Sequence, residues 1–430
     1  MPARRKRWAA VIVALPLMGM NIAHTQALPL PTQQPSLWEG INFAYTSGGD
    51  LAECGATTAL DGKPGIRIID ISSSRAARLA ALPEHLPDIE TLERVISPAQ
   101  PNHYLILISF DGTGNYPDII HVKNNATINI RYPEKCAGYL ESESDRKFGF
   151  QINALETNPR LLFDQVVTAG YDHAKVIYHA GVGTGIQYAP KELRHIINIV
   201  QQGVGFGMES AVEENMEEMW SGINEIRRIN NSAVIYIVTT GFSRGAASAR
   251  LFNHQFYVEK RKEEAKYRGI NIYASILYDT VSTQYPKFDH LALKNFDTPK
   301  EIRRVYHFVA ENEYRPTFRG HPAKKRADGS CAKNVTEISI PGAHADIGGG
   351  YDMHGISSVT LALGVDILKA IGVPVNPNYA EKNKPEKSRF VIHASDSQDG
   401  KIEDPSFTQL RSMIYSAAPC RAVPFDQNPI

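Results

Sequence analysis

The stretch that most constrains the fold is residues 233–250, which reads as a buried strand, a tight turn and the start of a helix. Residues 233–238 are apolar and rich in Val and Ile, as expected of a parallel strand covered on both faces. The turn at residues 241–245, Gly-Phe-Ser-Arg-Gly, follows the G-x-S-x-G pattern, in which a strained bend exposes a serine at the carboxyl edge of a sheet. Glycine suits so sharp a bend because it lacks a Cβ. The alternative is a surface serine in a glycine-rich turn.

Other apolar runs extend this pattern along the chain. Further strands are predicted at residues 66–71, 103–110, 175–179, 271–278, 304–310 and 335–340, the last of these closing the sheet. Helical patterns occupy residues 208–229, 246–256 and 359–371. Because strands and helices alternate, the sequence predicts an α/β fold, α/β-hydrolase-like and doubly wound, with a mostly parallel sheet and helices on both faces.

The chain begins with a segment that is typical of export. Residues 4–7 are basic, residues 8–20 are largely apolar, and small residues lead to Ala27, so residues 1–27 are predicted to be a signal peptide. The apolar run is too short for a stable membrane anchor, although an uncleaved tail is the alternative. We expect an exported protein, periplasmic or secreted. The remaining divisions are an N-terminal extension at 28–102, a catalytic domain at 103–372 and a C-terminal extension packed on that domain at 373–430.

Charge and cysteine content narrow the function classes. Lys plus Arg and Asp plus Glu number 46 each, so no net charge favours binding to nucleic acid. An exported chain with four cysteines is expected to form disulfides, and three pairings are open. The cysteines are Cys54, Cys136, Cys331 and Cys420. They show no C-x-x-C spacing, so we expect no zinc site. We also expect no other metal and no cofactor.

A serine hydroxyl needs a neighbouring base, and the base needs an orienting group. In α/β-hydrolases these partners follow the serine in the order acid, then histidine, each after a later strand. Asp279 ends the strand after the Ser243 helix, and His344 lies in the glycine-rich loop after the strand at 335–340. The sequence therefore predicts Ser243 as nucleophile, His344 as general base and Asp279 as the orienting carboxylate.

The transition-state oxyanion would be held by backbone N–H groups. We expect one donor from Arg244, directly after the nucleophile, and one from Gly112 or Thr113 in the loop after the strand at 103–110. Asp111 is interpreted as shaping this loop. Binding a metal or simply starting a turn are its alternatives.

Two residues compete for roles in this site. Asp346 could orient a histidine, but it stands only two residues from His344, which is poor geometry for bonding the imidazole edge. His393 follows the apolar residues 390–392 and could replace His344 as the base.

Six motifs together resemble the phospholipase effector family of bacterial type VI secretion and its fungal relatives. In order they are Phe-Asp-Gly-Thr-Gly-Asn at 110–115, Gly-Val-Gly-Thr-Gly at 181–185, Gly-Phe-Ser-Arg-Gly-Ala at 241–246, Tyr-Asp-Thr-Val at 278–281, Ala-Glu-Asn-Glu-Tyr-Arg at 310–315 and Gly-Ala-His-Ala-Asp-Ile-Gly-Gly-Gly-Tyr at 342–351. The resemblance implies an α/β-hydrolase fold, a triad at Ser243, Asp279 and His344, and hydrolysis of ester bonds in glycerophospholipids.

The leading hypothesis is thus an exported serine esterase of the phospholipase type. Its expected partners are a phospholipid or other acyl-ester substrate and, peripherally, a membrane surface. The alternatives are a carboxylesterase, a neutral-glyceride lipase, and a non-catalytic member of the fold that binds a lipid or protein.

Overall fold

The computed structural model describes residues 41–42, 66–113, 120–122, 127–128, 157–179, 181, 206–281, 296–313, 318–351, 354–376, 390–395 and 419–425. The chain divides into two units, residues 1–36 and 37–430, and all described residues belong to the second. The predicted signal peptide, Cys54, Cys136 and residues 182–185 of the second glycine-rich motif lie outside the described residues.

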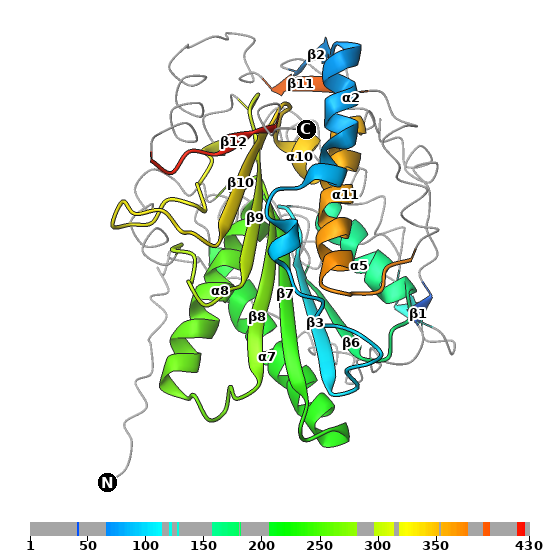
Figure 1. Cartoon of the computed structure of the whole chain (residues 1–430), viewed down its shortest axis with the longest axis vertical. Coiled ribbons are helices and arrows are strands. Elements are labelled where there is room, and N and C mark those ends of the chain that lie inside the picture. Colours follow the sequence, from blue (N-terminus) through cyan, green and yellow to red (C-terminus); the bar gives the residue numbers. More distant parts are fainter. Residues whose placement is uncertain are drawn as a thin grey trace, which may run out of the picture. The chain divides into compact units, whose positions relative to one another are not determined.

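Within the described residues, a sheet of seven parallel strands runs through the middle of this unit (Figure 1). In spatial order the strands are β12 (Val423–Pro424), β10 (Val335–Ile340), β9 (Arg304–Ala310), β8 (Ile270–Tyr278), β7 (Val234–Phe242), β3 (His103–Phe110) and β6 (Ala174–His179). Because all strands point the same way, the loops that follow them meet at one edge of the sheet.

The chain changes direction across the sheet between β3 and β7. From β3 it crosses to β6 on one side, whereas from β7 it proceeds to β8 on the other side. Such a switch point opens a crevice at the carboxyl ends of the two strands, which is where open α/β sheets bind ligands. Here β3 leads to Asp111 and β7 leads to Ser243.

Helices cover both faces of the sheet. On one face lie α5 (Asn158–Thr168) and α11 (Gly355–Ala370), and on the other lie α7 (Phe206–Ile229) and α8 (Arg244–Lys262) (Figure 1). Alternate side chains of β3 enter the two halves of the core. Leu105 and Leu107 pack with α5 and α11, whereas Ile106 and Ile108 pack with α7 and α8. The predicted α/β fold class is confirmed.

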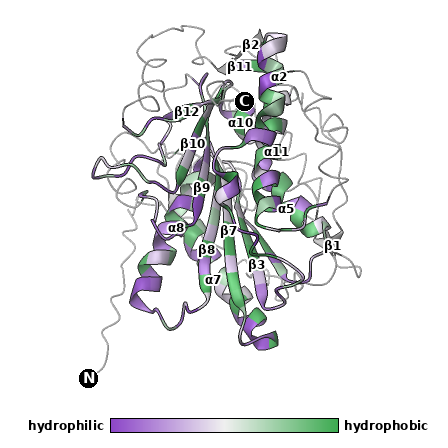
Figure 2. Ribbon diagram, in the orientation of Figure 1, coloured by the Kyte–Doolittle hydropathy of each residue, from purple (hydrophilic) through white to green (hydrophobic). Residues whose placement is uncertain are grey.

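Strand formation follows from side-chain chemistry. Central strands carry runs of apolar residues (Figure 2), because both of their faces are covered. The predicted strands at 103–110, 304–310 and 335–340 have the predicted bounds, and those beginning at 175 and 271 start one residue earlier.

None of the helices in the described part of the chain is long and apolar enough to cross a membrane.

Smaller elements surround the sheet. Strand β2 (Ile66–Asp70) pairs antiparallel with β11 (Val391–Ser395), so segments from both extensions lie side by side. Next come α2 (Ser73–Ala81), η1 (Leu82–His85) and η2 (Ile89–Thr91), whose leucines and isoleucine pack into the α5–α11 half of the core. A separate three-stranded sheet contains β1 (Ile41–Asn42), β4 (Ile120–Val122) and β5 (Thr127–Ile128).

Three features differ from the sequence-based expectation. The sheet does not end at β10, because β12 pairs with its outer edge. Helix α5 was not predicted, since its polar Asn158, Arg160 and Asp164 are buried and hide the usual amphipathic pattern. Finally, the glycine-rich loop after β10 contains a short helix, α10 (His344–Gly348).

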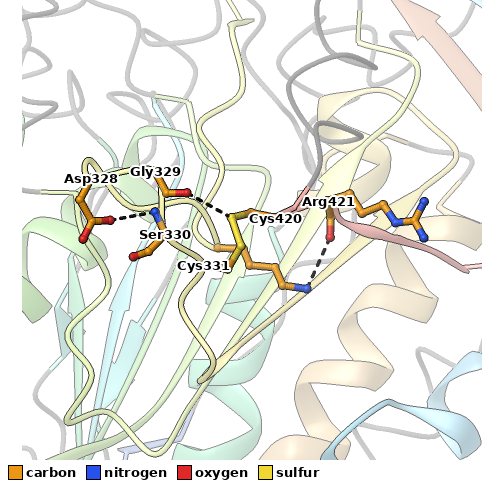
Figure 3. Close-up of a disulfide and its surroundings, with 7 residues drawn as sticks. Asp328, Gly329, Ser330, Cys331, Cys420 and Arg421 are labelled. Atoms are coloured by element: carbon orange, nitrogen blue, oxygen red, sulfur yellow. Dashed lines mark hydrogen bonds between the residues drawn. A yellow bond between two sulfur atoms is a disulfide. The ribbon is translucent and has the colours of Figure 1, made fainter.

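A disulfide joins the sheet's edge to the C-terminal segment. Cys331 lies just before β10 and Cys420 just before β12, and their sulfur atoms are 2.03 Å apart (Figure 3). Close by, Lys324 Nζ donates to the Arg421 carbonyl at 3.4 Å. Of the three pairings open from sequence, the structure thus selects the one that links these two cysteines.

Candidate active site

The candidate nucleophile stands on a strained bend. Ser243 lies between the last residue of β7 and the first of α8, with φ 59° and ψ −126°. A positive φ is rare for a residue with a Cβ, and such strain concentrates at functional sites. The strand before it is fixed in the sheet's centre, and the helix after it packs on the same sheet, so the bend cannot relax without moving both.

Close packing explains the two glycines of the bend. A Cβ on Gly241 would lie 2.5 Å from the Gly245 carbonyl oxygen, and a Cβ on Gly245 would lie 2.3 Å from the carbonyl oxygens of both Phe110 and Asp111. The start of α8 therefore rests directly against the loop after β3. This contact brings the two predicted sources of oxyanion donors together.

Asp279 and His344 form a buried pair. The Asp279 carboxylate accepts a hydrogen bond from His344 Nδ1 at 2.6 Å through Oδ2, and from the Ala310 backbone N–H at 3.0 Å through Oδ1. Asp279 is fully buried and His344 is 5 % exposed. Because a carboxylate can only accept, Nδ1 of a neutral His344 carries the proton, and Nε2 is the basic nitrogen.

Several contacts link this pair to the serine bend. The His344 ring packs against the ring of Phe242, with centroids 4.4 Å apart, and against that of Phe318 at 4.9 Å. Val281, two residues after Asp279, donates its N–H to the Ser243 carbonyl at 3.3 Å. The structure therefore brings the neighbourhoods of Ser243, Asp279 and His344 together at the carboxyl edge of the sheet.

Asp111 is held by three protein groups. Its Oδ1 accepts from the Gly112 N–H at 2.6 Å and the Thr157 hydroxyl at 2.5 Å, and its Oδ2 accepts from the Tyr178 hydroxyl. Burial is the largest influence on its carboxyl group and raises its pKa above the ordinary value. These donors come from three separate segments, which is the arrangement expected of a loop-shaping carboxylate.

The expected oxyanion donors have different surroundings. The Gly112 N–H donates to the Asp111 carboxylate. Thr113 is the next residue along the loop. The Thr113 hydroxyl is buried and has no hydrogen-bond partner among the described residues. Arg244 begins α8, so its N–H lies at the positive end of the helix dipole. Burial lowers the pKa of the Arg244 side chain to about 10.

The two rival residues bind each other. His393 Nδ1 bonds Asp346 Oδ1 at 2.6 Å, and the His393 backbone N–H donates to Asp346 Oδ2 at 2.9 Å. The His393 ring stacks on Tyr351 with centroids 3.9 Å apart, and the ring is fully buried. Burial raises the pKa of Asp346. This second pair attaches α10, which carries His344, to β11.

Sequence reasoning gave no role to the motif at 310–315. In the structure, Asn312 Oδ1 accepts from the Gly342 N–H at 2.8 Å, and Glu313 Oε2 accepts from the His344 N–H at 3.2 Å. The signal available in the sequence was a cluster of polar residues at the end of a buried strand. Among the described residues, no group of three or more His, Cys, Asp or Glu side chains is arranged to hold a metal ion.

The chain matches a known protein family over part of its length. Residues 252–365 match the family described as the catalytic domain of Tle1-like phospholipase effectors of the type VI secretion system. This stretch contains Asp279 and His344 and begins after Ser243. The resemblance to type VI phospholipase effectors that the six motifs predicted is confirmed. No curated protein matches the chain.

Two solved structures are similar in outline. An uncharacterized protein from Pseudomonas aeruginosa is 17 % identical, with a TM-score of 0.41, and the match covers 84 % of this chain and 56 % of that one. The Tle1 effector bound to the VgrG spike of the type VI secretion system is 23 % identical, with a TM-score of 0.34, covering 58 % of this chain and 51 % of that one. The chain thus spans about half the length of the two solved chains.

Proposed function

Starting from the match to a Tle1-like catalytic domain, we propose that the chain is a serine esterase that hydrolyses acyl ester bonds of glycerophospholipids. The observation that carries this proposal is the 2.6 Å hydrogen bond between Asp279 and His344, beside a serine on a strained strand-to-helix bend. A fixed acid–imidazole pair next to such a serine is the arrangement that activates a hydroxyl.

The proposed reaction uses three side chains. His344 Nε2 removes the proton from Ser243 Oγ as that oxygen attacks the ester carbonyl, and Asp279 stabilises the resulting imidazolium through Nδ1–H. His344 then returns the proton to the departing alcohol oxygen, which leaves an acyl-enzyme. Water, deprotonated by His344, attacks the acyl-enzyme, releases the fatty acid and restores Ser243.

The oxyanion hole is assigned to two backbone N–H groups. Thr113 is favoured over Gly112, because the Gly112 N–H is already directed to the Asp111 carboxylate. Arg244 supplies the other donor from the first position of α8. In this proposal Asp111 orients the loop and takes no part in proton transfer.

Loss of the nucleophile tests the reaction type. The full-length chain is expected to release p-nitrophenol from p-nitrophenyl butyrate, and Ser243→Ala should lower kcat by about 1,000-fold or more. Ser248→Ala is the matched control, because that buried serine lies one turn further along α8. The control should keep its activity, and both variants should keep the circular dichroism spectrum. An unchanged rate in Ser243→Ala would remove the assignment.

Lipid substrates separate the alternatives. Fatty acid released from phosphatidylethanolamine or phosphatidylglycerol vesicles, but not from a triglyceride emulsion, supports the phospholipase. Release from triglyceride only indicates a neutral lipase, and turnover of soluble esters only indicates a carboxylesterase. Vesicle binding without turnover of any ester indicates a non-catalytic member of the fold.

Export belongs to the same proposal. Residues 1–27 have the pattern of a signal peptide, and a disulfide between Cys331 and Cys420 forms most readily in an oxidising compartment. We place the mature protein in the periplasm or outside the cell, in peripheral contact with a membrane surface. Peptide mapping of protein recovered from the periplasm should show a mature start at Leu28.

A further inference from the structure

The backbone of Asp279 is unusual. Its φ is 40°, in the left-handed region that residues with a Cβ rarely adopt. Such a conformation persists only where neighbouring groups hold it in place. On its N-terminal side, the Asp279 N–H donates to the Phe308 carbonyl at 2.7 Å, which continues the pairing of β8 with β9.

On the C-terminal side of Asp279 the next backbone N–H bonds a side chain of the neighbouring strand instead of a backbone carbonyl. The Thr280 N–H donates to Nε2 of His307, at 3.1 Å. His307 lies within β9 and is fully buried, as is Thr280. The peptide group directly after the candidate triad acid is therefore held by an imidazole from the next strand.

Glu337 determines which nitrogen of that imidazole accepts. It stands opposite His307 in the β9–β10 register and is fully buried, and its Oε2 lies 2.8 Å from His307 Nδ1. The same oxygen accepts from the Ala323 N–H at 2.7 Å. His307 Nδ1 carries a proton that it donates to this carboxylate. In a neutral His307 the other ring nitrogen, Nε2, then carries no proton and accepts the hydrogen bond from the Thr280 N–H.

This chain of bonds reaches both halves of the candidate site. Through Thr280 it holds Asp279, whose carboxylate bonds His344. One residue further on, the Val281 N–H donates to the Ser243 carbonyl at 3.3 Å. A shift in the segment 279–281 would thus move the acid relative to its histidine and also loosen the serine bend.

We propose that His307 is a positioning residue, which fixes the backbone after Asp279 so that its carboxylate meets His344, and that Glu337 sets the His307 tautomer. The proposal rests on the proposed function, because it assigns Asp279 to the triad. His307 touches no substrate in this scheme. A buried polar pair in the interior of two strands is costly, and here Glu337 Oε1 has no hydrogen-bond partner among the described residues. The bonds that the pair does make lead to the candidate site.

Two substitutions remove opposite halves of the network. His307→Gln places an amide oxygen near the position of Nε2, so it can still accept from Thr280 but no longer donates to Glu337. His307→Asn places an amide N–H near the position of Nδ1, so it can still donate to Glu337 but no longer accepts from Thr280. Each variant loses one buried hydrogen bond. Because His307→Gln removes the donor to a buried carboxylate, it should lose at least as much stability as His307→Asn, so a loss of activity confined to His307→Asn would not be explained by instability.

The proposal predicts that activity separates these variants. In the full-length chain, kcat for p-nitrophenyl butyrate should fall by about 30-fold or more in His307→Asn and by less than about 5-fold in His307→Gln, with KM nearly unchanged in both. A misplacement of about 1 Å in a catalytic group is enough for a loss of this size. Equal losses in the two variants, or a larger loss in His307→Gln, would overturn the proposal.

A spectroscopic measurement tests the same idea without turnover. The low-field proton resonance of His344 Nδ1–H reports its bond to Asp279, and it should persist in His307→Gln and disappear in His307→Asn. In the wild type, nitrogen-15 NMR should show His307 protonated at Nδ1 and coupled through Nε2 to the Thr280 N–H. A proton on His307 Nε2 at pH 7.5 would refute the proposal even if neither variant folded.

These readouts distinguish the two failures. If Ser243→Ala leaves the wild-type rate unchanged, the proposed function fails, while the His344 resonance still decides whether His307 positions Asp279. If Ser243→Ala is inactive but the resonance and kcat are alike in both His307 variants, only the positioning role fails.

Discussion

Gly245 is the residue at which the two loops of the candidate site touch. A methyl group there would lie 2.3 Å from two carbonyl oxygens of the loop after β3, a distance that only backbone movement can relieve. The bend that carries Ser243 and the loop that carries Thr113 would therefore be forced apart.

We predict that Gly245→Ala lowers the free energy of unfolding by about 2–4 kcal/mol and reduces kcat in the fraction that folds. Urea unfolding and ester hydrolysis measure the two effects. Gly222→Ala is the control, because Gly222 lies inside α7, where alanine favours the helix. The three atoms nearest its added Cβ all belong to the Lys175 side chain, which can move aside. Full activity in Gly245→Ala would contradict the proposed contact.

Which residues lie together was predictable where it follows from position along the chain. A serine, an aspartate and a histidine, in that order and each after a strand, suggested Ser243, Asp279 and His344 as the site, and the structure pairs the latter two. Asp346 and His344 sit two positions apart on α10, where side chains point in different directions. The pairing of Asp346 with His393 joins segments 47 residues apart, and no local pattern in the sequence indicates such a partner.

At the scale of elements, α10 depends on β11. Asp346 accepts from the Ala343 N–H at 2.8 Å at the start of α10 and from His393 on β11. The short helix that presents His344 has few backbone hydrogen bonds of its own, so bonds from side chains hold it. The Asp346 carboxylate adds to those that Glu313 makes with the His344 N–H and Asn158 with the Ile347 carbonyl. Both partners of the Asp346–His393 pair are buried, so breaking it would leave a carboxylate without its side-chain donor.

We predict that His393→Phe lowers the free energy of unfolding by about 3–5 kcal/mol, because it keeps a ring beside Tyr351 but removes the donor to Asp346. His393→Asn should lose less than half as much, since its amide can still donate to Asp346. Denaturant unfolding monitored by circular dichroism compares the two. If Asn and Phe are equally destabilising, ring packing rather than the hydrogen bond is what matters at this position.

Elements were predictable to the extent that their surroundings are uniform. Strand β3, with both faces covered, is a nearly continuous apolar run and was found with the bounds it has. Strands β9 and β10 carry His307 and Glu337 among their apolar residues, and they too were found with the bounds they have. Helix α5 has buried side chains on all sides, and Asn158 bonds the carbonyls of Ile347 and Ser357, so its sequence shows no polar face. Two-residue β12 is too short to produce a pattern.

At the scale of the whole molecule, the disulfide holds the last described strand to the sheet. Cys331 and Cys420 are separated by 89 residues, and the bond connects the segments that lead into β10 and β12 (Figure 3). Without β12, the outer side of β10 would present unpaired backbone groups, which are prone to pair with other chains.

We predict that replacing both cysteines, Cys331→Ser with Cys420→Ser, lowers the free energy of unfolding by about 2–5 kcal/mol and increases aggregation. Urea unfolding under non-reducing conditions measures the first effect, and light scattering measures the second. Peptide mapping of the unreduced wild type should recover the two cysteines in one linked fragment. Recovery of either one linked to Cys54 or Cys136 would contradict the pairing.

The pairing of β2 with β11 bears on when the protein becomes functional. Residues 66–70 are made early, and their partner strand is made more than 300 residues later. Contacts so distant along a chain form slowly, because a long loop must close first. Because β11 also supplies His393, which bonds Asp346 on α10, a nascent chain still lacking residues 391–395 would be without this one of the bonds that hold the helix. The surroundings of His344 would thus be completed only after a segment more than 300 residues downstream of β2 has been made.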